Sequence, residues 1–256
     1  MTQKESTLAT DFIKLSESAS AEDIERAHHL AHEWLVVENS LDQADIRHTI
    51  PIFGSARIPS PEETIDTDLR AQRCTGLTPY YEEARQLAAR LGQLIEQRQL
   101  HHTKLVTGGG PGIMEAANRG AHDVGHESIG LNIVIPKEQR VNPFIAAKHS
   151  FEFQYFAMRK MHFLKRAKAI VVFPGGFGTL DELFETLTLI QTRKMPAVPI
   201  LLYGKKFWNT LINLDYLAEQ GMIDPADHQL YHVVDSIEEC CAVVEPIIET
   251  LALTHE

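Results

Sequence analysis

A glycine-rich turn followed by an acidic segment carries the most chemical information in this sequence. In "VVFPGGFGTLDELFE", residues 171–185, an apolar run gives way to three glycines within four positions, then to Thr179 and Glu182. Glycines at a strand-to-helix turn let backbone N–H groups approach a ligand, and the following helix directs its free N–H groups to the same place. This pattern predicts a phosphate site in which Thr179 caps the helix or contacts a phosphate oxygen.

Two further strand ends have the same character. "VTGGGPGIME" (106–115) is a second glycine turn, and "FGSAR" (53–57) is a turn of small residues. Neither glycine turn is a Walker A loop, because no Gly-Lys-Ser/Thr follows, and each alone could be a tight turn without a ligand. The carboxyl ends of parallel strands meet at one edge of a sheet, so the presence of these turns in one sheet favours a single nucleotide crevice. Pro111 is expected in the first turn of the next helix. Glu115 is either a surface acid or a ligand contact.

A basic helix is expected before the strand that leads into the glycine turn at 174–178. "YFAMRKMHFLKRA" (155–167) contains Arg159, which precedes Glu182 by one helix-plus-strand unit. An arginine here can pair with a phosphate or a carboxylate, or can belong to a solvated helix face. Because Asp181 and Glu182 point about 100° apart on a helix, only one can face the turn. We expect Glu182 near the helix N-terminus to be ionised, and such a carboxylate stabilises positive charge on a sugar during bond cleavage.

Alternating apolar runs and amphipathic stretches define the elements that must position these residues. They predict an α/β fold: a Rossmann-like, doubly wound, mainly parallel sheet with helices on both faces. We expect a helical extension over residues 1–48, with its helix at 21–40, and a nucleotide-binding catalytic domain over 49–256. The region 58–77 is expected to be a loop and 206–221 a single helix. Pro246 is expected to kink or shorten the last helix. The expected strands fall within residues 48–57, 103–110, 128–135, 149–154, 168–176, 197–204 and 230–235.

Composition excludes several functions. A net charge of -11 argues against broad binding to nucleic acid or to an anionic membrane. The three cysteines form no metal or redox spacing, and no apolar run is long enough to span a bilayer. With a polar N-terminus, these features predict a cytoplasmic protein with reduced thiols. His28 and His32 are expected on a surface or interface helix, so we expect no metal and no cofactor.

The motifs resemble those of a known family. "PGGFGTLDE" is similar to the PGGxGTxxE signature of the LOG family, the cytokinin-activating nucleoside 5'-monophosphate phosphoribohydrolases. "MRK" at 158–160, "GGGPGIMEAANRGA" and "FGSAR" resemble the other family motifs, and the similarity runs from about residue 49 to residue 220. The resemblance implies hydrolysis of the N-glycosidic bond of a nucleotide such as AMP, giving a free base and ribose 5-phosphate.

The resemblance also implies roles for individual residues. Arg159 and Glu182 would be the catalytic pair, and whether Arg159 holds the carboxylate or the phosphate stays open. A homodimer or higher homo-oligomer is implied, in which a neighbouring subunit helps to shape the site. The residues implied in substrate binding are Gly54, Ser55, Gly109, Gly110, Met158, Lys160, Gly175, Gly176, Phe177, Gly178 and Thr179.

Some features depart from the short plant-type members. The stretch before residue 49 and the loop 58–77 are longer, and "EQRVNPFI" (138–145) replaces the plant-type sequence. The chain is more similar to the larger bacterial members, for which plain purine or pyrimidine nucleotides are the expected substrates. The alternative is a non-catalytic carrier of a nucleotide or a molybdopterin-type cofactor on the same fold. The presence of both Arg159 and Glu182 favours the enzyme.

Overall fold

The computed structural model describes residues 14–15, 17–62, 74–135 and 141–253, so most of the predicted loop over 58–77 lies outside the described residues. The chain divides into two compact units, residues 1–43 and 44–256. The first contains α2 (Ala21–Gln43), which confirms the helix predicted at 21–40. Ser20 caps it by accepting a hydrogen bond from the Asp23 N–H. None of the described helices is long and apolar enough to cross a membrane.

The second unit is built on a seven-stranded sheet in the order β4-β3-β2-β1-β5-β6-β7, and every pair of neighbours is parallel. The chain belongs to the α/β class with a Rossmann-like sheet, as the alternating pattern predicts. All seven strands fall within the predicted segments. They are β1 (His48–Phe53), β2 (Thr103–Thr107), β3 (Ile129–Ile133), β4 (Ser150–Phe153), β5 (Ile170–Val172), β6 (Ile200–Tyr203) and β7 (Tyr231–Val234).

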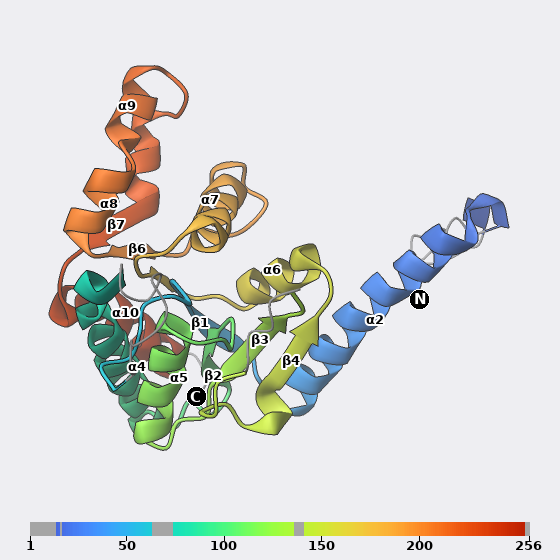
Figure 1. The fold of residues 1–256 in the computed structure, drawn as a ribbon, viewed down its shortest axis with the longest axis horizontal. Coiled ribbons are helices and arrows are strands. Elements are labelled where there is room, and N and C mark those ends of the chain that lie inside the picture. Colours follow the sequence, from blue (N-terminus) through green and yellow to red (C-terminus); the bar gives the residue numbers. More distant parts are fainter. Residues whose placement is uncertain (1–13, 16, 63–73, 136–140, 254–256) are drawn as a thin grey trace. The chain divides into compact units, whose positions relative to one another are not determined.

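Helices cover both faces of this sheet (Figure 1). One face carries α4 (Pro79–Gln97), α5 (Ile113–Asp123) and α10 (Ile237–Leu253), whereas α6 (Phe156–Lys165), α7 (Phe177–Gln191) and α8 (Lys205–Leu211) follow β4, β5 and β6. The helix-to-sheet contacts are made by apolar stripes; Leu87, Leu91 and Ile95 of α4, for example, recur every four residues and are fully buried. Short 3₁₀ turns complete the unit: η1 (Thr75–Leu77), η2 (Ala147–His149) and η3 (Pro225–Leu230).

Three local predictions were wrong. The segment 206–221 forms two helices, because Ile212 is extended and the Asn213 side chain accepts the Tyr216 N–H to start α9 (Leu214–Glu219). The predicted shortening of the last helix is wrong, since α10 continues past Pro246 to Leu253, whereas a kink at Pro246 stays a prediction. Helix α5 begins only at Ile113, so Pro111 precedes its first turn.

The strand order creates a topological switch point at β1. From β1 the chain proceeds through β2 and β3 to β4 on one side, then returns and proceeds through β5 and β6 to β7 on the other. The connections that leave the carboxyl ends of β1 and β5 therefore diverge to opposite faces of the sheet. Ligands of open parallel sheets bind in the crevice that this divergence leaves. The turns at residues 54–57 and 174–178 lie at this position.

Candidate active site

A cavity of about 550 Å³ lies at the switch point. It is open to solvent on one side and combines residues that the sequence separates by more than 150 positions. The turn after β1 contributes one wall, the start of α7 another, and α6 supplies Arg159. The lining residues from the predicted site are Gly54, Ser55, Arg159, Gly175, Gly176, Phe177, Gly178, Thr179 and Glu182.

Backbone hydrogen bonds through Ser55 hold the three turns around this cavity together. The Ser55 N–H donates to the Pro174 carbonyl, and its own carbonyl accepts the Ile113 N–H, both at 3.0 Å. The approach is so close that a Cβ at Gly112, where φ is 69°, would overlap the Ser55 carbonyl oxygen. Glycine is needed there on both grounds. Ser55 thus has a clear structural role, as the link between the β1, β2 and β5 turns.

The start of α7 presents free backbone donors to the cavity. The helix begins at Phe177, directly after Gly176, and no side chain of the described residues caps it. The first N–H groups of a helix have no partner within the helix, and the macrodipole makes this end positive. Thr179 is buried and packs so closely on Gly175 that a methyl group at position 175 would overlap its side chain. Thr179 is not the N-cap, which corrects one of its two predicted roles; the open end suits an anion.

Arg159 and Glu182 form a buried ion pair at the wall of the same cavity. Arg159 Nη2 lies 3.2 Å from Glu182 Oε1, and the two side chains are only 10% and 12% exposed. The guanidinium lies 5.1 Å from the centroid of the Phe156 ring and 5.6 Å from that of Phe163. Its Nε is buried and has no hydrogen-bond partner among the described residues. A buried donor without a partner is costly, and because this nitrogen is shielded from solvent it does not itself face the cavity.

Burial raises the pKa of Glu182 to about 7, although the Arg159 cation opposes the shift. The expectation that a helix N-terminus keeps Glu182 ionised is therefore wrong in direction. Glu182 is the sixth residue of α7, and the influence of the dipole falls off within the first turn. Desolvation of the charged form outweighs it. A carboxyl group that titrates near neutral pH is suited to proton transfer as well as to charge stabilisation.

Four predicted binding residues do not line the cavity. Gly109 and Gly110 are buried, and their carbonyls accept hydrogen bonds from Asn142 Nδ2 at 3.1 and 3.0 Å; Gly108 lines the cavity instead. Met158 is half-buried outside the lining. Lys160 lies in a separate shallow groove along α7. Arg159 faces the cavity, so the next residue along α6 points about 100° away from it.

Two residues that sequence reasoning did not select contribute to the site. Arg57 lines the cavity, is exposed, and has no side-chain partner among the described residues; the motif "FGSAR" contains it. Asn142 fastens the second glycine turn from 32 residues further along the chain, and it also donates to Asn118 Oδ1 at 2.9 Å. A long-range contact of this kind gives no periodic signal in a single sequence.

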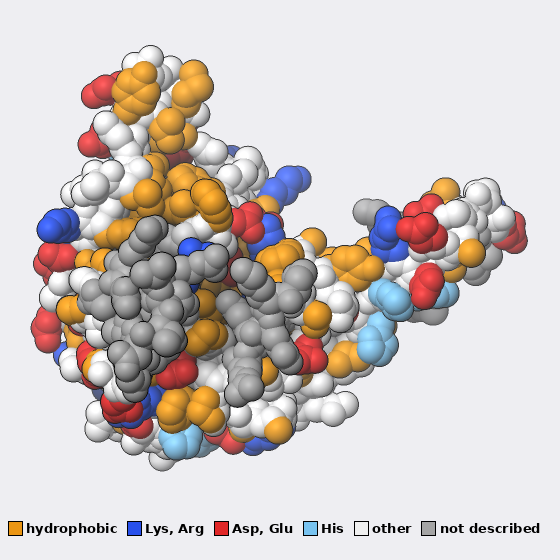
Figure 2. All heavy atoms as spheres, viewed as in Figure 1, with side chains coloured by type: hydrophobic (Ala, Val, Ile, Leu, Met, Phe, Trp, Pro, Cys, Tyr) orange, Lys and Arg blue, Asp and Glu red, His pale blue; other side chains and the backbone are white. Residues whose placement is uncertain are grey.

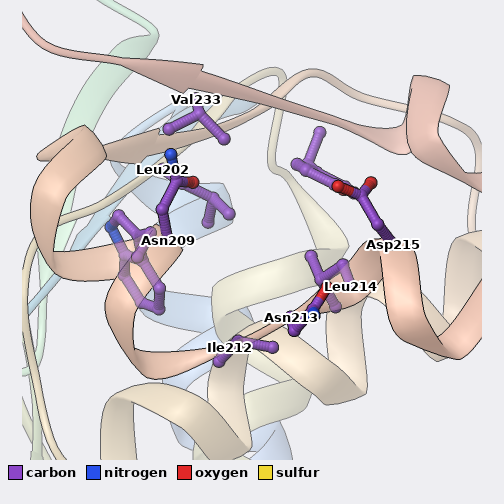
Figure 3. A pocket seen from close by; sticks show the side chains of 9 residues that line it. Leu202, Asn209, Ile212, Asn213, Leu214, Asp215 and Val233 are labelled. Atoms are coloured by element: carbon purple, nitrogen blue, oxygen red, sulfur yellow. The ribbon is translucent and has the colours of Figure 1, made fainter.

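A second hollow of about 480 Å³ lies between β6, β7, α8 and α9, at the far edge of the sheet (Figure 3). Its lining residues include Trp208, Ile212, Leu214, Asp215 and Tyr231. It includes no glycine turn and none of the predicted site residues. The switch-point cavity, which combines an open helix N-terminus with a buried ion pair, is the candidate active site.

Comparisons with known proteins show the family to which the chain belongs. The model of a protein family described as "Possible lysine decarboxylase" matches residues 114–244, just over half of the chain. The chain therefore belongs to this family, the LOG family of the sequence analysis. A probable cytokinin riboside 5'-monophosphate phosphoribohydrolase of Oryza sativa subsp. japonica is 30% identical over 153 residues, which is 58% of this chain and 64% of the relative. A cytokinin riboside 5'-monophosphate phosphoribohydrolase of Arabidopsis thaliana is 29% identical over 155 residues, 59% of this chain and 67% of the relative.

A solved structure shares the fold, and a second gives a lower score. The structural genomics target TM1055 superposes with a TM-score of 0.50 at 17% identity, covering 78% of this chain and 99% of that chain. The molybdenum cofactor carrier protein of Chlamydomonas reinhardtii gives a TM-score of 0.48 at 19% identity, covering 79% of this chain and 99% of that chain. At 17% identity, the first likeness shows the Rossmann-like architecture alone.

Proposed function

We propose that this protein hydrolyses the N-glycosidic bond of a nucleoside 5'-monophosphate such as AMP, releasing the free base and ribose 5-phosphate. The observation that carries this proposal is the buried Arg159–Glu182 pair in the cavity that the open N-terminus of α7 also lines. An anion site and a carboxylate beside it are the two features that this reaction requires. The similarity to phosphoribohydrolases supports the same reaction class.

In the proposed mechanism the phosphate is bound by the N–H groups of residues 176–179. Glu182 lies five residues after Phe177, about 7.5 Å along the helix axis, a span comparable to the length of ribose 5-phosphate. The pentose would then lie against the carboxylate. As the base departs, positive charge develops on the ribose, and ionised Glu182 stabilises it and orients the attacking water. Arg159 holds the carboxylate in register, the first of its two predicted roles.

The direct test is incubation of the full chain with AMP, GMP, CMP and UMP, with free base measured by chromatography. The proposal predicts base release from at least one nucleotide and far slower release from the matching nucleoside, which lacks the phosphate. Tight nucleotide binding with no base release would instead support the carrier alternative. Release at equal rates from nucleoside and nucleotide would contradict the phosphate site.

We expect the guanidinium of Arg57, which lines the cavity and is exposed, to contact the phosphate. Arg57→Gln should therefore raise KM for AMP roughly tenfold, the equivalent of about 1.4 kcal/mol for one charge-assisted hydrogen bond. Turnover at saturation should change by less than about twofold, since Arg57 is remote from the reacting bond in the proposed pose. Arg47→Gln is the matched control, because Arg47 is exposed and pairs with Asp45 outside the cavity. Equal KM values for both variants would remove Arg57 from the anion site.

We also propose that the chain forms a homodimer or higher homo-oligomer through the face next to the cavity. Phe156, Met161 and Phe177 are 49%, 49% and 93% exposed, and Phe177 and Phe184 line a groove along α7. Figure 2 shows apolar side chains exposed over α6. Large exposed apolar side chains that gather in this way favour burial against a partner. Sedimentation should show a species heavier than one chain, reduced by Phe177→Asp; a single-chain species at all concentrations would contradict this.

A further inference from the structure

A cluster of ion pairs joins α6 to α7 beside the cavity. Lys160 Nζ lies 3.1 Å from Asp181 Oδ2 and 3.0 Å from Glu185 Oε2, and its side chain is 17% exposed. One position earlier on α6, Arg159 contacts Glu182. Two consecutive cations of α6 thus meet three acids within two turns of α7, with Glu182 facing the cavity and the other two acids facing the groove.

These contacts leave little capacity for Lys160 to bind a substrate. Its ammonium group already has two carboxylate partners, and Lys160 lines the groove along α7 and not the cavity. Charge-assisted contacts of this kind are the strong ones, so a substrate would have to compete with both carboxylates for the ammonium group. The contacts therefore indicate a role other than the substrate contact implied by the family resemblance.

We propose that Lys160 is a positioning residue that fastens α7 to α6 through Asp181 and Glu185, keeping Glu182 beside Arg159 and offsetting the negative charge that surrounds it. The consequence for turnover rests on the proposed function, whereas the consequence for the titration of Glu182 does not. Among the described residues, the charged groups that influence the pKa of Glu182 are Arg159 and Lys160 from α6, and Asp181 and Glu185 from α7.

Removal of the Lys160 charge should change the pKa of Glu182 in a predictable direction. Lys160 favours the ionised form of Glu182, and the two flanking acids disfavour it. Without the ammonium group, the negative charges of Asp181 and Glu185 are no longer offset, and the protonated form of Glu182 is favoured. The acid limb of the pH–rate profile of Lys160→Gln should therefore move upward by roughly half a pH unit or more. Lys160→Arg, which keeps the charge, should restore the wild-type limb.

The matched control is Lys194→Gln, which removes one positive charge from an exposed position beyond the C-terminal end of α7. It should leave the limb unchanged. If Lys160 contacts substrate instead, Lys160→Gln will raise KM and its acid limb will coincide with that of the Lys194→Gln control. That result would overturn the inference, and so would a uniform loss of activity at every pH.

A titration that needs no turnover separates this inference from the proposed function. In the full chain labelled with ¹³C at the glutamate carboxyl, the Glu182 resonance is assigned by its loss in Glu182→Gln. Its midpoint should rise in Lys160→Gln and fall in Glu185→Gln, which removes a neighbouring acid. Glu185→Gln also tests the inference should Lys160→Gln fail to fold. Midpoints equal to wild type in the folded variants would overturn the inference, even for an active enzyme.

Discussion

Replacement of Glu182 with Gln is expected to lower the turnover of AMP by about 10²-fold or more while nucleotide affinity stays within a few-fold. Glutamine has the shape of glutamate and can still accept a hydrogen bond from Arg159, now 3.2 Å from Glu182 Oε1. What it lacks is the negative charge that stabilises the developing oxocarbenium ion. The phosphate contacts, which lie in the first turn of α7, are not altered.

The measurement is single-turnover release of free base together with a nucleotide Kd from calorimetry. Glu152→Gln is the matched control, since Glu152 is exposed on the edge strand β4. Unchanged turnover in Glu182→Gln would remove Glu182 from the mechanism. Loss of binding in parallel with turnover would show that the carboxylate holds the substrate and does not act on the transition state.

The second large effect is expected for Arg159→Gln, which should lower turnover at pH 7 by about 10²-fold and move the acid limb upward. In the wild type that limb should lie near pH 7, where the raised pKa of Glu182 places it. Burial raises the pKa of Glu182, and the Arg159 cation is the principal group that opposes the rise. Without it, Glu182 stays protonated at neutral pH and the charged catalyst is lost. Arg159→Lys keeps the charge and should retain a limb closer to wild type.

Arg159→Gln should also lower the stability of the fold, and by an amount that grows as the pH rises. A carboxyl whose folded-state pKa lies above its unfolded value binds protons more tightly when folded, so stability falls as pH rises between the two values. The melting-temperature deficit of Arg159→Gln relative to wild type should therefore widen from pH 5 to pH 8. A deficit that is constant with pH would indicate only lost packing between Phe156 and Phe163.

The sheet was predictable from the sequence because its signals are local. Each buried strand is a short apolar run, and parallel order follows from the alternation with helices. The break at Asn213 was missed, because a capping asparagine within an apolar periodic stretch looks like any other polar position. Its effect depends on the tertiary contacts that let Ile212 become extended.

The site was predictable to the level of its turns and its ion pair, but less so in its side-chain directions. Glycine turns at strand ends converge for topological reasons, and Arg159 and Glu182 do meet. Lys160 and Gly109 were assigned to the substrate from the family resemblance, and each adjoins a residue that lines the cavity. Neighbours in sequence point in different directions on a helix, and a buried glycine can serve a network such as that of Asn142. The pKa of Glu182 depended on burial, which no short motif specifies.

The most direct test of the central claim is a crystal structure of the Glu182→Gln variant with AMP, in which slow hydrolysis should leave the nucleotide intact. The phosphate should lie about 3 Å from the backbone nitrogens of residues 176–179, with the ribose C1' against the side chain at position 182. A nucleotide bound in the hollow beside α9, or bound in the cavity with its base at the start of α7, would contradict the account.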